Sequence, residues 1–544
     1  MKRECSMKIE AFIAPVLFVG AMAIGQLSAA ASLPQPVKTD LGAVSGTYSA
    51  TTGITAFKGI PYATPPVGDL RWKPTVPATK WTGVLKADHF GANCVQRPRP
   101  VMNGQTPEAF QTIQGSVSED CLFLNVWTPA KSATEKLPVM VWIHGGGYSG
   151  GSGSIPMFDG EELARKGVVV ITINYRLGLM GFLALKELDA ESKQHVSGNY
   201  GILDMIESLK WISRNIAGFG GDPKNVTIFG ESSGGSCVHH LTATPLAKGL
   251  FQRGISESGT FYARDPEGSG GPSSMKTLAE AEAQDETYLH NAGIDSLAKL
   301  RAMTVEQILA LPRERGAHGD FYGAVIDGYV YPDGYFTALN KGNVADVPYI
   351  LGGNTDEGGG SPHPVSTVAE FQENLKRKFG DKADEAMKLY PATTDAEAAQ
   401  AKNTLAVDYG RMSKYLWAQA YAKVHHSPVY IYSWNHTLPG PNSDEEGANH
   451  TSEITYVFNS LAKAGPDRPF VQADKDVADK MTTYWTNFAK TGDPNGKGLP
   501  VWPVSTPDKK VEMVVGDNDH SIPPVSTEAR FEFLKKFMES QPAW

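Results

Sequence analysis

A serine set among glycines at the end of an apolar run is the first candidate for chemistry in this chain. Residues 228–236 read IFGESSGGS, so Ser232 follows Ile228 and Phe229 within the pattern Gly-x-Ser-x-Gly. This pattern is typical of a nucleophile elbow, a strained turn from a strand to a helix that exposes the serine hydroxyl. Unpaired N–H groups at the start of that helix favour a developing oxyanion. The motif therefore predicts that Ser232 is a nucleophile.

A second match to the same pattern, Gly147 to Gly151, follows a triple glycine rather than a strand, so its context favours another role. It belongs to the run WIHGGGYSG, residues 142–150, which comes directly after an apolar segment. Consecutive glycines let backbone N–H groups approach a ligand closely, and an HGGG run is typical of the oxyanion loop that accompanies a nucleophile elbow. We predict that the N–H groups of Gly146, Gly147 and Ser233 bind the oxyanion.

A serine hydroxyl also needs a base to remove its proton and an acid to hold that base in the right tautomer. In folds with a nucleophile elbow the chain order is serine, acid, histidine. The segment GGNTDEGG offers Asp356 and Glu357 as acids, and spacing alone does not choose between them. Of the 13 histidines, His450 in NHTSEITYVF lies where the order requires the base. Among its competitors, His425, His426 and His436 lie near the last predicted strand or before it, and His520 lies close to the C-terminus. His239 and His240 lie on the helix after the elbow.

The elements that must hold these residues alternate along the chain. Short apolar runs, which predict strands, cover residues 137–143, 168–175, 225–229, 347–353 and 428–434. A helical pattern over 203–216 separates two of these runs, and another helix begins after Ser232. Buried runs that alternate with amphipathic helices indicate βαβ units, hence a mostly parallel sheet covered on both faces. The sequence therefore predicts an α/β fold.

We predict one elaborated domain over residues 32–544, because no linker rich in proline, glycine and serine divides this span. Two insertions near 274–312 and 366–426 are dense in Ala, Glu, Lys and Leu. They predict helices that pack over one edge of the sheet as a cap or side region.

Residues 1–31 predict a secretory signal peptide, with basic residues first, an apolar run over 12–25, and small residues at the end. The apolar run is too short to span a bilayer, so we expect a secreted or periplasmic protein without stable membrane insertion.

Cleavage leaves Cys94, Cys121 and Cys237, and two of the three can pair in an oxidising compartment. The neighbours of Cys237 predict a small buried residue. The net charge of -9 argues against nucleic acid as a partner.

These motifs and several others resemble the type-B carboxylesterase family, which includes cholinesterases and bacterial broad-specificity esterases. The matching segments include FKGIPYATPPVGDLRW, SEDCLFLNVWTP, NYRLGLMGFL, FGGDPKNVTIFGESSGG, GGNTDEG, NHTSEITYVF and FAKTGDPNG. The resemblance implies an α/β-hydrolase fold and a serine hydrolase that cleaves small carboxylic esters without a metal or an organic cofactor. It also implies that Glu357 is the triad acid and that His450 is the base. Further pairs implied by the same matching are Cys94 with Cys121 as a disulfide, Arg71 with Glu119 as a salt bridge, and Ser258 behind the triad acid.

The chain departs from this family pattern at two places. No tryptophan lies between Cys94 and Cys121, where cholinesterases carry one that binds a cation, so choline esters are not expected substrates. Ser233 replaces the alanine that is more usual after the nucleophile. An acyltransferase or an amidase would use the same triad. A non-catalytic binding protein of this fold would typically lack the serine or the histidine, and this chain has all three members in order.

Overall fold

The structure is a computed structural model of the chain, and it describes part of the 544 residues. The described residues are 1, 32–98, 113, 115–262, 264, 274–312, 322–358, 360–465 and 467–542. Contacts divide the chain into two units, Met1–Ala31 and Ser32–Trp544. The predicted signal peptide, residues 1–31, lies outside the described residues except for Met1.

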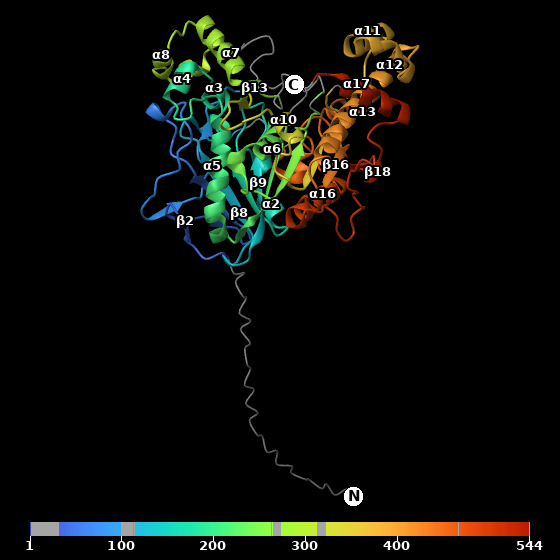
Figure 1. Ribbon diagram of the computed structural model, residues 1–544. Coiled ribbons are helices and arrows are strands. Elements are labelled where there is room, and N and C mark those ends of the chain that lie inside the picture. The colour runs from blue at the N-terminus through green and yellow to red at the C-terminus, as the bar shows by residue number, and fades with distance from the viewer. Residues whose placement is uncertain are drawn as a thin grey trace. The chain divides into compact units, whose positions relative to one another are not determined.

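The second unit is built on an 11-stranded sheet (Figure 1). From one edge to the other, its strands are β18 (His520–Ile522), β17 (Glu512–Val515), β16 (Val429–Trp434), β15 (Tyr349–Asn354), β12 (Arg253–Glu257), β11 (Gly221–Glu231), β9 (Leu137–Ile143), β10 (Val169–Ile173), β8 (Phe123–Thr128), β4 (Thr55–Pro61) and β3 (Thr47–Tyr48). Neighbouring strands from β17 to β10 are parallel, whereas β18 at one edge and β8, β4 and β3 at the other pair antiparallel. The predicted α/β fold is confirmed, and the antiparallel edges are an addition to it.

The remaining elements surround this sheet. The helices are α2 (Glu161–Ala164), α3 (Gly178–Phe182), α4 (Lys186–Glu191), α5 (Tyr200–Asn215), α6 (Ser233–Ala243), α7 (Leu278–Asn291), α8 (Leu297–Arg301), α9 (Val305–Leu309), α10 (Tyr335–Asn340), α11 (Val368–Phe379), α12 (Ala383–Leu389), α13 (Asp395–Ala422), α14 (Ser443–Glu446), α15 (Ile454–Val457), α16 (Gln472–Thr491) and α17 (Glu528–Ser540). Short strands form small separate sheets: β1 (Val37–Lys38), β2 (Ala43–Ser45) and β5 (Val84–Lys86); β6 (Asn93–Cys94) and β7 (Val117–Ser118); β13 (Lys276–Thr277) and β14 (Val325–Ile326). Within the described ranges, none of the helices has the length and apolar character needed to cross a bilayer.

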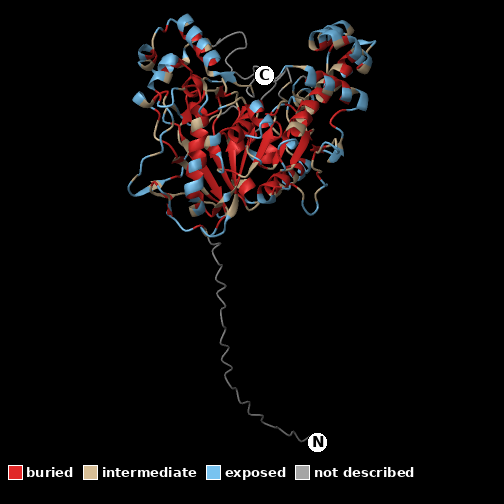
Figure 2. Cartoon of the chain, viewed as in Figure 1, coloured by how far each residue is buried: buried red, intermediate tan, exposed pale blue. Residues whose placement is uncertain are grey.

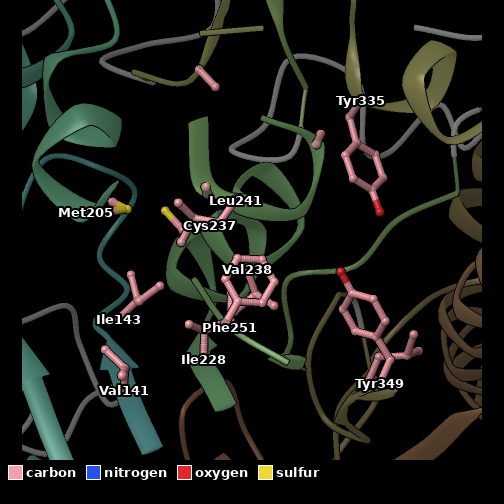
Figure 3. Close-up of a cluster of buried hydrophobic side chains, with 14 of the residues drawn as sticks. Val141, Ile143, Met205, Ile228, Cys237, Val238, Leu241, Phe251, Tyr335 and Tyr349 are labelled. Atoms are coloured by element: carbon pink, nitrogen blue, oxygen red, sulfur yellow. The ribbon is translucent and has the colours of Figure 1, made fainter. Parts of the chain in front are cut away.

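The central strands are apolar throughout because helices cover both faces of the sheet. Alternate residues of β9 belong to two different buried clusters. Val141 packs with residues of α5 and α6 on one face, and Trp142 packs with residues of α16 on the other. Figure 2 shows this buried centre of the sheet in red. In Figure 3, Val141 lies among the side chains of the first cluster, which also includes Cys237 of α6. Cys237 is fully buried, as the sequence predicts.

Both predicted insertions contain helices, but they do not pack over one edge of the sheet. Figure 1 shows α7 and α8 on one side of this unit and α11 and α12 on the other. Tyr288 of α7 packs in a cluster with Leu179 of α3 and Leu188 of α4. Tyr415 of α13 makes an edge contact with Phe531 of α17, with ring centroids 5.4 Å apart. The helices of the first insertion pack on α3 and α4, and α13 of the second insertion packs on α17. These partners lie in different parts of the fold.

Candidate active site

Ser232 lies between the last residue of β11 and the first residue of α6. Its backbone has φ 56° and ψ -126°, a conformation that is strained for a residue with a side chain. The Ser232 N–H donates to the carbonyl of Glu257 at 2.8 Å, and the Ser232 carbonyl accepts the Ser236 N–H at 3.0 Å. These hydrogen bonds hold Ser232 in its strained conformation. The strand, turn and helix that the elbow pattern predicts are all present.

Glycines are required at the elbow because it packs directly against the end of β9. A Cβ atom on Gly234 would lie 2.1 Å from the carbonyl oxygen of Ile143, and one on Gly230 would lie 2.5 Å from the same oxygen. A Cβ atom on Gly145 would lie 2.6 Å from the carbonyl oxygen of Glu231. The two glycine-rich segments thus approach each other backbone to backbone, which places the loop after β9 next to Ser232.

The glycine loop, residues 145–151, is bonded to the first residue of α6. The Gly147 N–H donates to the Ser233 hydroxyl oxygen at 2.9 Å, and the Tyr148 N–H points to the same oxygen at 3.4 Å. Ser149, the serine of the second Gly-x-Ser-x-Gly match, donates its hydroxyl to the Gly146 carbonyl at 3.4 Å within this loop. The N–H group of Gly147, one of the predicted oxyanion donors, is therefore already bonded to the Ser233 side chain.

The structure brings Glu357, and not its neighbour Asp356, to His450. The Nδ1 atom of His450 lies 2.5 Å from Oε2 of Glu357. The other carboxylate oxygen of Glu357 accepts the Ser258 hydroxyl at 2.9 Å and the Asn354 N–H at 2.8 Å. The Asp356 carboxylate instead accepts the Ala448 N–H at 2.7 Å. The contact between Ser258 and Glu357, which the family resemblance implies, is thus present.

The second ring nitrogen of His450 faces the residue directly before Ser232. Nε2 lies 3.1 Å from Oε1 of Glu231, whose side chain is fully buried. Among the residues that the structure describes, no hydrogen bond joins the Ser232 hydroxyl to His450. The two ring nitrogens of His450 thus contact two carboxylates, Glu357 and Glu231. Catalytic hydrogen bonds often tighten only when substrate binds.

Buried carboxylates set the charge of His450. Partial desolvation of the imidazole works against the cation, but Glu231, Glu357 and Glu453 outweigh it and raise the pKa of His450 toward about 10. The side chain is 47% exposed, so water screens part of this attraction. Burial alone would raise the pKa of Glu357, yet the hydrogen bond and the charge of His450 lower it to about 2. In this resting arrangement the pair is an imidazolium and a carboxylate.

Glu453 and Glu231 are residues of this site to which sequence reasoning assigned no role. Burial and the charge of Glu357 raise the pKa of Glu453 to about 7, and the Asn354 side-chain amide donates to this acid at 2.6 Å. Both acids lie inside motifs that the sequence displays, one directly before Ser232 and one three residues after His450. The motifs do not show that these two side chains point toward the imidazole. The only signal in the sequence was their position next to Ser232 and close to His450.

Three of the competing histidines are held by partners elsewhere. His436 has Asp474 at 3.0 Å from Nε2 and Asp517 at its other ring nitrogen. His239 contacts the Thr260 hydroxyl at 2.7 Å, and His240 lies 3.2 Å from the Tyr148 hydroxyl. Of these, none contacts Glu357, so the structure singles out His450 as the histidine beside the candidate acid.

Two further pairs implied by the resemblance are present. Cys94 and Cys121 form a disulfide. Arg71 donates two hydrogen bonds to Glu119, at 2.6 and 2.5 Å. Within the described part of the chain, no group of three or more His, Cys, Asp or Glu side chains is arranged to hold a metal ion.

A cavity of about 170 Å³ lies beside the glycine loop. Its lining combines apolar side chains, among them Leu177, Met180 and Ile308, with polar ones, among them Gln96, Arg97 and Ser149. The cavity extends from the loop toward α7 and α9, so one of the helical insertions supplies part of its wall.

Comparisons with known proteins agree with this geometry. The sequence model of the Carboxylesterase family matches residues 34–534. The fumonisin B1 esterase of Sphingopyxis macrogoltabida is 36% identical over 511 residues, which cover 90% of this chain and 88% of that protein. The para-nitrobenzyl esterase of Bacillus subtilis (strain 168) is 35% identical over 492 residues, 86% of this chain and 92% of that protein. A solved PNB esterase structure matches with a TM-score of 0.73 and 30% identity, covering 91% of this chain and 98% of that one. The chain therefore belongs to the carboxylesterase family and is a hydrolase of carboxylic esters.

Proposed function

We propose that Ser232, His450 and Glu357 form the catalytic triad of this esterase. The observation that carries the proposal is the 2.5 Å contact between His450 and Glu357, made beside the strained turn that presents Ser232. Glu357 holds the proton on Nδ1 of His450, which leaves Nε2 of the neutral ring as the atom that accepts the serine proton. Ser258 and the Asn354 N–H hold the carboxylate from behind.

The reaction proceeds in two halves. The Ser232 oxygen attacks the ester carbonyl carbon while neutral His450 takes the hydroxyl proton, and the N–H groups of Gly146, Gly147 and Ser233 stabilise the oxyanion. Collapse of this intermediate breaks the bond to the alcohol oxygen, which receives the proton from His450. Water then attacks the acyl-enzyme with His450 as the base, and the acid leaves as Ser232 regains its proton. Each oxyanion donor is worth about a hundredfold to a thousandfold in rate.

The apolar side chains in the cavity beside the glycine loop, Leu177, Met180 and Ile308, favour esters with a medium-sized uncharged group. Arg97 in the same lining donates to the Leu309 and Leu311 carbonyls. A cavity of about 170 Å³ holds a short chain or a ring rather than a polymer. We expect the purified protein to hydrolyse p-nitrophenyl butyrate and hexanoate at least tenfold faster, in kcat/KM, than the succinate half-ester. Release of p-nitrophenol at 400 nm measures the rates. Faster cleavage of the anionic ester would contradict this substrate class.

An acyltransferase or an amidase with the same triad is the alternative. Product analysis separates the three activities, because a transferase delivers the acyl group to an added alcohol in preference to water, whereas an amidase cleaves anilides efficiently. We expect free acid to remain the main product when methanol or glycerol is added, and anilides to react much more slowly than esters.

Replacement of Glu231 with glutamine is expected to shift the pH profile. The base must be neutral to accept the serine proton, so kcat/KM rises as pH passes the pKa of His450. Glu231 holds that pKa up, and its removal should move the rising limb to lower pH by about 1 to 3 units. Profiles of p-nitrophenyl butyrate hydrolysis from pH 5 to 10 measure the shift. Asp356→Asn is the matched control, because Asp356 bonds to Ala448 instead of His450. A limb that stays in place in Glu231→Gln contradicts the assignment of the pKa to this carboxylate.

We propose that the enzyme works in the periplasm or outside the cell. Support comes from the predicted signal peptide over residues 1–31 and from the disulfide between Cys94 and Cys121, since disulfides persist in oxidising compartments. Fractionation of cells that express the full chain, followed by N-terminal sequencing of the product, tests this. Recovery from the cytosol with residues 1–31 attached would contradict it.

A further inference from the structure

The Ser233 hydroxyl occupies a concave site formed by the glycine loop. Its oxygen receives the Gly147 N–H at 2.9 Å and lies 3.4 Å from the Tyr148 nitrogen. Gly146, Gly147 and Tyr148 have φ of 112°, 62° and 56°, so this stretch of backbone is left-handed. Successive N–H groups that converge in this way form a site that favours a negatively charged oxygen. Here a neutral hydroxyl oxygen from the same chain fills the site.

The bond to Ser233 directs the Gly147 N–H away from a substrate. Ser233 is fully buried, whereas Gly147 is half-buried. An amide has a single hydrogen, and a 2.9 Å bond to a buried oxygen aims that hydrogen into the protein. An oxyanion donor contributes only when it points at the position where the charge develops. In the resting structure the Gly147 N–H does not meet this condition.

The Gly147 N–H belongs to the peptide that joins Gly146 to Gly147, and the residues that follow this peptide are anchored. The Tyr148 carbonyl accepts the Gly178 N–H at 2.6 Å, and its fully buried ring places the hydroxyl 3.2 Å from His240. Gly151 is bonded at both its N–H and its carbonyl to the side chain of Gln96. The carbonyl of the Gly146–Gly147 peptide accepts the Ser149 N–H at 3.2 Å, so a turn of this peptide weakens that bond as well as the bond to Ser233. Both residues are glycines, so no Cβ atom opposes the turn.

We propose that Ser233 is a positioning residue whose hydroxyl competes with the substrate oxyanion for the Gly147 N–H. The proposal rests on the proposed function, because it concerns the oxyanion donors of that same reaction. During acylation the Gly147 N–H leaves the Ser233 oxygen for the charged oxygen of the tetrahedral intermediate. A charged acceptor forms the stronger bond, so the exchange favours the intermediate. Breaking the resting bond still adds to the barrier, so Ser233 slows the reaction relative to a residue without the hydroxyl.

The test is Ser233→Ala, which removes the competing acceptor and keeps the Ser233 backbone N–H. Loss of a neutral hydrogen bond of ordinary strength is expected to raise kcat for p-nitrophenyl butyrate by roughly two- to tenfold, with little change in KM. A trifluoromethyl ketone, which forms a charged tetrahedral adduct with the nucleophile, should bind more tightly by the same factor. Ser233→Thr restores a hydroxyl and should lose most of this gain.

Ser208→Ala is the matched control, because Ser208 is a fully buried helical serine whose hydroxyl bonds to the Met205 carbonyl of its own helix. It should change neither kcat nor the affinity for the ketone. An unchanged or lower kcat in Ser233→Ala, with a wild-type melting temperature, overturns the proposal. A higher kcat without tighter ketone binding also overturns it, because the gain then does not come from the oxyanion. A wild-type protein that hydrolyses no ester refutes the proposed function instead.

Discussion

Substitution of Ser232 with alanine is expected to lower kcat for p-nitrophenyl butyrate by about a millionfold, as removal of a triad serine does. The alanine keeps the elbow backbone and its hydrogen bonds to Glu257 and Ser236 but leaves no oxygen to attack the carbonyl. Activity that remains has to come from attack by water aided by the oxyanion donors. Initial rates with purified protein measure the loss.

Ser149→Ala is the informative counterpart, because Ser149 belongs to the second Gly-x-Ser-x-Gly match in the same chain. Ser149 lies within the glycine loop and bonds to the Gly146 carbonyl, so its loss should lower kcat by less than about tenfold. A Ser232→Ala enzyme that retains a tenth of the wild-type rate would show that Ser232 is not the nucleophile. A millionfold loss in Ser149→Ala would transfer that role to the other motif.

The central strands were predictable because their environment leaves a clear pattern. The run over 137–143 is β9 with the same bounds, and the run over 428–434 is β16 (Val429–Trp434). Both strands are buried on two faces, so the continuous apolar run is itself the signal. β12 (Arg253–Glu257) was not predicted, although it pairs with β11 and β15 in the middle of the sheet. Its sequence RGISE begins with a charge and ends with a buried acid, so no apolar run marks it.

The candidate site was predictable as a set of residues but not as an arrangement. Chain order and motif spacing pointed to Ser232 and His450, and the choice between Asp356 and Glu357 came from the family resemblance. That choice depends on which side chain the turn after β15 directs toward His450, a property of the backbone that spacing does not contain. The engagement of Gly147 by Ser233 depends on contact between segments 86 positions apart, and no local pattern encodes it.

Replacement of Glu357 with glutamine is expected to lower kcat by about ten-thousandfold, as loss of a triad carboxylate does. The glutamine amide is close in shape to the acid, but it has no charge to stabilise the imidazolium and can donate to Nδ1, which selects the wrong tautomer of His450. Removing one of the carboxylates that raise the pKa of His450 also makes the neutral ring more abundant at pH 7. The larger fraction of neutral His450 does not restore the orientation of its ring. The rate should therefore fall although the base is less protonated.

Asp356→Asn is the control for this loss, because the neighbouring carboxylate bonds to the Ala448 N–H and does not reach His450. It should lower kcat by less than about tenfold, the effect of one hydrogen bond. Rates from pH 6 to 10 and melting temperatures separate an effect on chemistry from one on folding. If Asp356→Asn fell by ten-thousandfold and Glu357→Gln did not, the acid of the triad would be Asp356. If neither variant lost more than tenfold, the pairing of Glu357 with His450 at 2.5 Å would have to be structural, and another group would orient the base.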